Sequence, residues 1–297
     1  MDLHIHTTLS DGAKRPTEIL DMAQKLGLDY ISITDHDNCF AYEELEKIDI
    51  KEHFEGKLIV GVELMSCFKG NAIEILGYGV DYHIINEWVR NRYSKEQIDI
   101  RDKTLFARLK KILQLNSKIK LSNNLNLPNE IPYEGYFKYM VYNDIIKYKE
   151  NERFLQENKI NSYEQFLRMG LSKKTSPIYM NQDEFLVNTE EVVNLIHKAG
   201  GLAFLAHIYK YQIEDHTKFL QELVDSNIGL DGIEANYSSF ESKQKSFIEE
   251  FAKKRNLYCS AGSDYHGKDG RTEKIGYGAG GKRIQKKYIE EWYSLIN

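Results

Sequence analysis

Apolar residues recur with two different periods along the first part of the chain. Short runs rich in apolar and β-branched residues predict buried strands at residues 2–6, 30–33, 58–62 and 72–80. Between the first two runs, apolar residues follow Pro16 at helical spacing and stop at Gly27, a typical start and end of a helix. Another helix is expected at residues 40–48. Strands that alternate with helices predict a parallel sheet or a (β/α) barrel.

This alternation stops at residue 84 and resumes after residue 187. Inside that interval, helical spacing predicts helices at residues 94–114, 136–149 and 162–169. We therefore expect a mainly helical insertion, residues 84–187, in a barrel formed by residues 1–83 and 188–297. Beyond the insertion, strands are expected at residues 202–206, 232–235 and 257–261, and helices at residues 189–198 (with Thr189 as N-cap), 213–226, 241–255 and 285–295.

Composition excludes several classes of protein. Of the 297 residues, 41% are hydrophobic and 29% are charged, which excludes a disordered chain. A net charge of −5 provides no overall positive field for nucleic acid or anionic membranes. No apolar run approaches the ~20 residues of a spanning helix, and the N-terminus does not resemble a secretory signal, so a cytoplasmic location is expected. The three cysteines lack metal-binding spacing and are interpreted as reduced thiols.

Residues that can bind metal ions follow the predicted strands. His4 and His6 are two apart at the end of the first strand, so both imidazoles can face the same side. Asp11 lies in the loop after the same strand. Later strands are followed by further histidines and carboxylates, which are His36, Glu63, His207, Asp264 and His266. Each alone would fit a turn, a helix cap or an ordinary histidine. Together, at the carboxyl ends where barrel active sites are built, they predict a site for more than one divalent ion.

Five motifs resemble the PHP (polymerase and histidinol phosphatase) family, in the family's order. They are Asp-Leu-His-Ile-His-Thr-Thr-Leu-Ser-Asp-Gly (2–12), Ile-Thr-Asp-His-Asp (33–37), Gly-Val-Glu (61–63), Leu-Ala-His (205–207) and Gly-Ser-Asp-Tyr-His (262–266). The resemblance implies a distorted (β/α)7 TIM-like barrel with up to three divalent ions. Chain length and the helical insertion are similar to the stand-alone phosphatases that act on nucleotides and oligonucleotides.

The resemblance also implies which residues hold each ion. One ion would be held by His4, His6, Glu63 and Asp264. Another would be held by Asp11, His36 and His266. Glu63 would bridge to a third, with His207 and, where relatives usually have histidine, Glu74. A carboxylate there favours Mn²⁺ over Zn²⁺, with Fe²⁺ also compatible; the alternative is a third site that is weak or empty.

Two departures from the family pattern concern the substrate. The Arg-x-His pair that grips phosphate in the phosphatase branch is missing from residues 132–137, and the usual His-Pro is His207-Ile208. Both disfavour a nucleoside 3′,5′-bisphosphate or an RNA end. Candidate substrate contacts are Lys210, Lys268, Arg271, Tyr133 and Tyr136, the tyrosines on an insertion expected to cover the carboxyl face as a lid. Solvated surface charges and packing within the insertion are the simpler interpretations.

The favoured hypothesis is a metal-dependent phosphoesterase, most of all a phosphomonoesterase on a small phosphorylated metabolite or nucleotide. His4, His6, Glu63 and Asp264 would act through a bound metal hydroxide, and Asp35 and Asp37 would orient imidazoles. One alternative is an amidohydrolase-type C–N hydrolase, although no strand end supplies its usual bridging lysine. The other is a regulatory metal-binding module with little activity. A membrane partner and nucleic acid beyond a short oligonucleotide are not expected, and the oligomeric state stays open.

Overall fold

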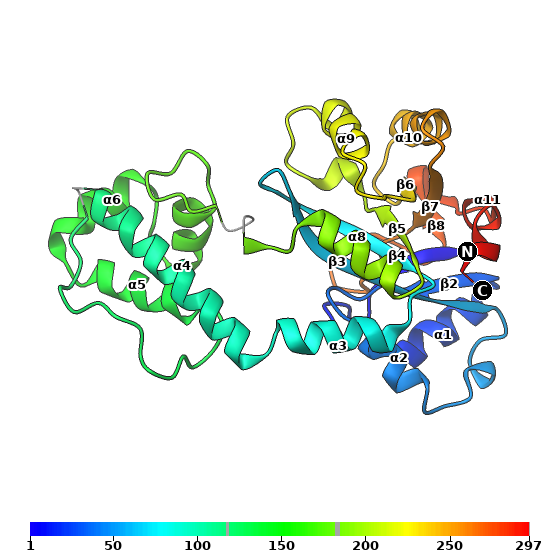
Figure 1. Ribbon diagram of the computed structural model, residues 1–297, viewed down its shortest axis with the longest axis horizontal. Coiled ribbons are helices and arrows are strands. Elements are labelled where there is room, and N and C mark those ends of the chain that lie inside the picture. Colours follow the sequence, from blue (N-terminus) through cyan, green and yellow to red (C-terminus); the bar gives the residue numbers. More distant parts are fainter. Residues whose placement is uncertain (117–118, 182–184, 297) are drawn as a thin grey trace. The chain divides into compact units, whose positions relative to one another are not determined.

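The computed structural model describes residues 1–116, 119–181 and 185–296. The chain forms two compact units (Figure 1). The first consists of Met1–Val89 and Leu186–Asn297, and the second of Arg90–Phe185. Among the described helices, none is both long enough and apolar enough to cross a membrane.

A seven-stranded sheet forms the centre of the first unit, with its strands side by side in chain order. The strands are β1 (Asp2–Ile5), β2 (Tyr30–Ile33), β3 (Lys57–Phe68), β4 (Asn71–Tyr78), β5 (Leu202–Leu205), β6 (Gly232–Tyr237) and β7 (Tyr258–Gly262). Beyond the end of β7, the amide of Asp264 donates to the carbonyl of His4 at 2.9 Å, and Tyr265 forms a bridge with Ile5. The sheet therefore curls into a nearly closed barrel, which confirms the predicted TIM-like fold class.

One strand runs against the predicted direction. β4 pairs antiparallel with both β3 and β5, whereas the other neighbouring strands are parallel. Only Lys69 and Gly70 separate β3 from β4, and both have positive φ (49° and 76°). A two-residue connection can join only antiparallel strands, because a parallel pair needs a crossover of a dozen or more residues. Glu63 and Glu74 consequently lie within strands, so the expectation that Glu63 follows its strand is wrong.

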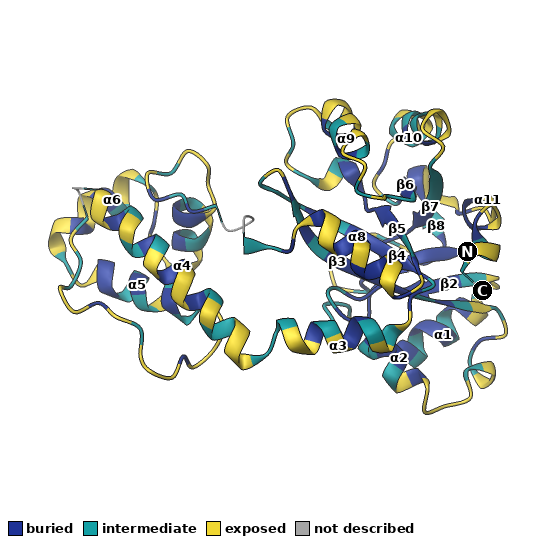
Figure 2. Cartoon of the chain, in the orientation of Figure 1, coloured by how far each residue is buried: buried dark blue, intermediate teal, exposed yellow. Residues whose placement is uncertain are grey.

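Helices lie around this sheet, and its strands are mostly buried (Figure 2). They are α1 (Pro16–Lys25), α2 (Phe40–Leu45), α3 (Tyr82–Arg92), α8 (Thr189–Lys198), α9 (His216–Asp225), α10 (Ser242–Lys254) and α11 (Lys287–Glu290). The N-cap of α8 is Asn188, whose side chain accepts from the amide of Glu190. Thr189 is instead buried and bonded to Ser66 Oγ at 3.0 Å, so its predicted capping role is wrong.

The second unit is helical and has a hydrophobic core of its own. Its main helices are α4 (Lys95–Leu115), α5 (Tyr136–Ile146) and α6 (Glu152–Glu157), followed by the short α7 (Tyr163–Gln165) and a π-helical turn, Phe166–Leu171. Leu109, Phe137 and Phe166 are completely buried in this core. Burial of such large side chains explains why the segment folds into a compact unit.

Candidate metal centre

All nine side chains predicted to bind metal lie in one cluster of the first unit. His4 lies on β1 and His6 directly beyond its end, so the two imidazoles project to the same side while Leu3 and Ile5 face the core. The other members come from β3, β4 and the loops after β1, β2, β5 and β7. These members are Asp11, His36, Glu63, Glu74, His207, Asp264 and His266.

The first group within the cluster is almost completely buried. It consists of His4, His6, Glu63 and Asp264, whose ligand atoms lie within 4.8 Å of one another. Glu63 Oε2 is 3.2 Å from His4 Nε2 and 3.2 Å from His6 Nε2. Asp264 Oδ1 is 3.4 Å and 3.0 Å from the same two nitrogens. Two imidazole nitrogens and two carboxylate oxygens thus converge on a space suited to one ion.

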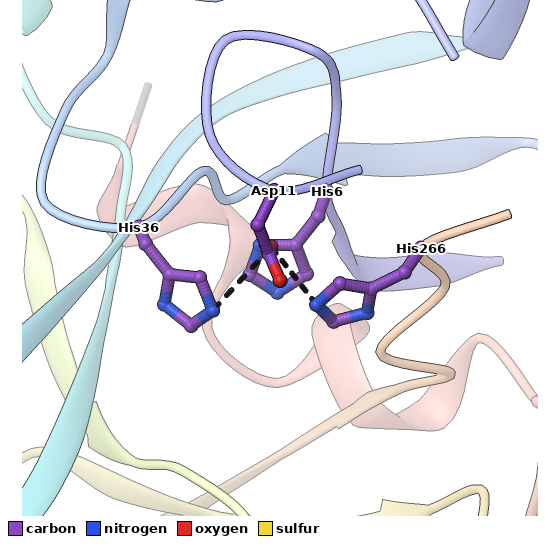
Figure 3. A group of neighbouring side chains, drawn as sticks. All are labelled: His6, Asp11, His36 and His266. Carbon is purple, nitrogen blue, oxygen red and sulfur yellow. Dashed lines mark ion pairs between the residues drawn. The ribbon is translucent and has the colours of Figure 1, made fainter. Parts of the chain in front are cut away.

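The second group surrounds Asp11, which lies nearer the surface (Figure 3). Asp11 Oδ1 is 3.8 Å from His6 Nδ1, 3.7 Å from His36 Nε2 and 3.0 Å from His266 Nε2. The buried Asp35 holds the loop that carries Asp11, because its carboxylate accepts from the amide and hydroxyl of Thr7 and from the hydroxyl of Ser10. Asp35 therefore shapes this loop, and no imidazole of the described residues bonds to its carboxylate, contrary to the expected orienting role.

The third group includes Glu74, the residue that departs from the family pattern. Glu63 Oε2 lies 3.2 Å and Glu74 Oε1 3.6 Å from His36 Nδ1. On the other side, His207 Nε2 is 2.9 Å from Glu63 Oε1 and 3.4 Å from Glu74 Oε2. The carboxylate of Glu63 is thus adjacent to both the first and the third group, in the position of a bridging ligand.

Burial and mutual charge shift the pKa values of the cluster strongly. Burial lowers the pKa of His6, but the neighbouring carboxylates of Asp264 and Glu63 outweigh it and raise that pKa to about 9. Burial likewise opposes the charge of Glu63, but His4 and His207 hold the pKa of this carboxyl well below its usual range. Burial and the neighbouring Glu63 raise the pKa of Glu74 to about 8. Without cations the cluster therefore retains protons at neutral pH, and a bound metal would displace them.

Four buried atoms of the cluster test whether metal ions fit it. These atoms are His6 Nδ1, Asp11 Oδ1, Glu63 Oε2 and His207 Nδ1. None of them has a hydrogen-bond partner among the described residues. An unsatisfied buried polar atom costs about 1–3 kcal/mol, so four in one place require an explanation. Because imidazole nitrogen and carboxylate oxygen are ordinary ligands of Mn²⁺, Fe²⁺ and Zn²⁺, divalent cations fit this site.

Sequence reasoning missed two residues on β6 that support the cluster. Glu234 is completely buried; its Oε1 lies 3.0 Å from His4 Nδ1, and its Oε2 accepts from the amide of His207 at 2.9 Å. The hydroxyl of Tyr237 donates to Asp264 Oδ2 at 2.7 Å. A single acidic residue in the predicted strand 232–235, which is otherwise apolar, was the available signal for Glu234, since a buried carboxylate needs a partner.

We predict that Glu234→Gln weakens metal binding and activity by about 10–100-fold, the usual cost of losing a group that orients a metal-binding histidine. The amide keeps the size of the side chain but loses the negative charge beside His4 Nδ1. Metal titration followed by calorimetry, with kcat measured at saturating metal, checks this. Glu241→Gln, a change on the exposed N-cap of α10, is the matched control. Equal metal affinity in both variants would contradict the orienting role.

The predicted substrate contacts are distributed more widely. Lys268 Nζ lies 2.8 Å from Asp11 Oδ2, directly at the second group. Arg271 pairs with Glu273 at 2.9 Å, and Lys210 lines a cavity with that same glutamate. Tyr133 and Tyr136 belong to the second unit, where their rings pack edge to face at 5.4 Å.

Curated relatives resemble this chain over most of its length. A 5′-3′ exoribonuclease of Haemophilus influenzae is 26% identical over 267 residues, which cover 89% of each chain. A phosphoribosyl 1,2-cyclic phosphate 1,2-diphosphodiesterase of Eggerthella lenta is 24% identical and covers 93% of this chain and 97% of its own. A 3′,5′-nucleoside bisphosphate phosphatase of Chromobacterium violaceum is 24% identical, covering 91% and 89%.

Solved structures and a family model agree with this resemblance. A proposed metal-dependent phosphoesterase from Bifidobacterium adolescentis shares the fold, with a TM-score of 0.59 and 19% identity over 99% of this chain and 95% of that one. The model of the PHP domain matches residues 2–232. The matched residues include seven of the nine clustered positions, and Asp264 and His266 lie beyond them. Because the match spans more than half of the chain, the chain belongs to the PHP family.

Proposed function

We propose that this chain is a metal-dependent phosphomonoesterase that acts on a small phosphorylated metabolite or nucleotide. The observation that carries the proposal is the carboxylate of Glu63, which lies against His4, His6, His36 and His207 at 2.9–3.2 Å. The PHP domain match, residues 2–232, contains seven of the nine clustered side chains, and Asp264 and His266 follow it in the sequence. Hydrolysis of a phosphate ester is the reaction class of the relatives as well.

The chain's own residues have separable roles in this proposal. His4, His6, Glu63 and Asp264 hold one cation, Asp11, His36 and His266 a second, and Glu63, Glu74 and His207 a third. Two or three bound divalent ions, of which Mn²⁺ is favoured, would supply a water molecule of lowered pKa and neutralise charge on the phosphate. Glu234 accepts from His4 Nδ1 and thereby leaves Nε2 directed at the cluster. Tyr237 fixes the second oxygen of Asp264.

Small substrates are favoured over nucleic acid. The Arg-x-His pair that grips phosphate in similar phosphatases is missing from residues 132–137. The similarity to exoribonucleases keeps short oligonucleotides as the second candidate substrate.

A phosphatase screen with metal-reconstituted protein tests the proposal. The chain is stripped with a chelator, reloaded with Mn²⁺, Fe²⁺ or Zn²⁺, and assayed for phosphate release from sugar phosphates, nucleotides and a short 5′-phosphorylated RNA. Metal-dependent release from the small esters is the expected result. Release of ammonia or acid from amides would instead support an amidohydrolase, and inertness with every metal would support a regulatory module.

Tyrosines of the second unit are proposed to contribute to substrate selection. Tyr133 is 54% exposed and packs on Tyr136, so it can offer both a ring face and a hydroxyl to a ligand. We predict that Tyr133→Ala and Tyr136→Ala raise KM for a preferred monophosphate severalfold, while Tyr30→Ala, at a tyrosine of β2, serves as the control. Best hydrolysis of 3′,5′-bisphosphates, with kinetics unchanged in both tyrosine variants, would contradict this selection.

A further inference from the structure

A cavity of about 410 Å³ lies in the first unit beside the metal cluster. Two of its lining residues connect it to that cluster. Tyr237 donates its hydroxyl to Asp264 at 2.7 Å, and the amide of Lys210 donates to the carbonyl of His207 at 2.8 Å. The volume is within the range of small-molecule sites. A ligand in this cavity would therefore contact two residues that are themselves hydrogen-bonded to proposed metal ligands.

The lining of the cavity suits an anion. Lys210 and Lys274 contribute two ammonium groups, and among the described residues neither has a carboxylate within ion-pair distance. Ser238, Ser239 and Thr272 add hydroxyl groups. The acidic member of the wall is Glu273, and Arg271 pairs with it at 2.9 Å. The lysines thus leave positive charge uncompensated at this position.

A glycine-rich turn forms one wall of the cavity without side chains. Gly278 and Gly281 line it, and Gly281 has a φ of +66° with nothing within 4 Å of where a Cβ would be. At Gly278, by contrast, a Cβ would meet Asn236 Oδ1 at 2.4 Å. The conformation therefore depends on glycine, and the absence of side chains leaves room for a ligand next to the lysines.

We propose that this cavity binds a second anionic group of the substrate, with Lys210 and Lys274 as specificity-determining residues. The inference rests on the proposed phosphomonoesterase function and deepens it by naming the substrate class, a small phosphate ester that carries a further phosphate or carboxylate. The metal cluster is rich in carboxylates, and Lys268, the lysine beside it, is paired with Asp11. The two lysines in the cavity wall would supply positive charge for the second anionic group.

A matched series of three-carbon esters tests the inference. Glycerol 3-phosphate has no second anionic group, 3-phosphoglycerate has a carboxylate and 2,3-bisphosphoglycerate has a second phosphate. We expect kcat/KM to be at least tenfold higher for one of the two latter esters than for glycerol 3-phosphate, through a lower KM. The better of the two identifies the second group. In Lys210→Ala/Lys274→Ala this preference should disappear, whereas Lys253→Ala/Lys282→Ala, which removes the same charge from exposed positions, should retain it.

Binding measured by calorimetry separates this inference from the proposed function. Affinity of the Mn²⁺-loaded protein for 2,3-bisphosphoglycerate and 3-phosphoglycerate should fall at least tenfold in the Lys210/Lys274 double variant relative to its control. Equal affinity in the two double variants overturns the inference whether or not any ester is hydrolysed. Equal kcat/KM for all three esters in wild type also overturns it but leaves the phosphomonoesterase proposal standing. That proposal fails separately, if no phosphomonoester is hydrolysed with any metal.

Discussion

Replacing Asp264 by alanine is expected to lower kcat by at least about 100-fold. Its Oδ1 lies 3.0 Å from His6 Nε2 and 3.4 Å from His4 Nε2, so the substitution removes a carboxylate from the most buried group of proposed ligands. Loss of metal-ion catalysis forfeits several kcal/mol of barrier reduction, and each 1.36 kcal/mol corresponds to about a factor of ten in rate. His4→Ala should have an effect of the same size, because His4 contributes an imidazole to the same group.

The fold should survive both changes. Because Asp264 has a φ of +57°, a left-handed conformation that asparagine tolerates better than alanine, we add Asp264→Asn as a further variant that preserves the backbone and an acceptor for the Tyr237 hydroxyl. Thermal unfolding followed by circular dichroism should show a cooperative transition in each variant. His53→Ala is the control, because His53 pairs with Asp21 at 2.8 Å outside the cluster. Retention of more than about a tenth of kcat in Asp264→Ala would contradict activation by the proposed metals.

The placement of most cluster residues could be predicted because it depends on local features. A strand followed by a turn puts its last side chains at one end of the barrel, and the spacing of His4 and His6 puts both on one face. The same reasoning gave the positions of His36, His207 and His266. The seven strands and the fold class follow from the same alternation, and they are confirmed.

The direction of β4 and the role of Glu234 could not be predicted in this way. The direction of β4 follows from the two-residue turn at Lys69 and Gly70, a local signal that competes with the expectation of continued parallel strands. Because that turn reverses the chain, Glu74 reaches the cluster from within a strand. Glu234 has no motif of its own, and its role depends on a contact with His4, 230 residues away in the sequence.

Glu74 is expected to determine which metal the third group prefers. Its carboxylate lies 3.6 Å from His36 Nδ1 and 3.4 Å from His207 Nε2, and the hydroxyl of Tyr211 holds its backbone by accepting from the Glu74 amide at 2.9 Å. Oxygen ligands suit Mn²⁺, whereas imidazole suits Zn²⁺. We predict that wild type is activated better by Mn²⁺ and that Glu74→His shifts the ratio of Mn²⁺ to Zn²⁺ activation toward Zn²⁺ on the order of tenfold, which corresponds to about 1.4 kcal/mol.

The number of protons released when Mn²⁺ binds provides a second test of the role of Glu74. Burial and Glu63 raise the pKa of Glu74 to about 8, so the metal-free carboxyl is protonated at neutral pH and must lose its proton to bind a cation. Mn²⁺ affinity should therefore increase as the pH rises toward about 8, and at neutral pH Glu74→Gln should release about one proton fewer than wild type when Mn²⁺ binds. Calorimetry in buffers of different ionisation enthalpy measures this number. Equal proton release by wild type and Glu74→Gln, together with equal activation of Glu74→His by both metals, would show that Glu74 does not bind the ion.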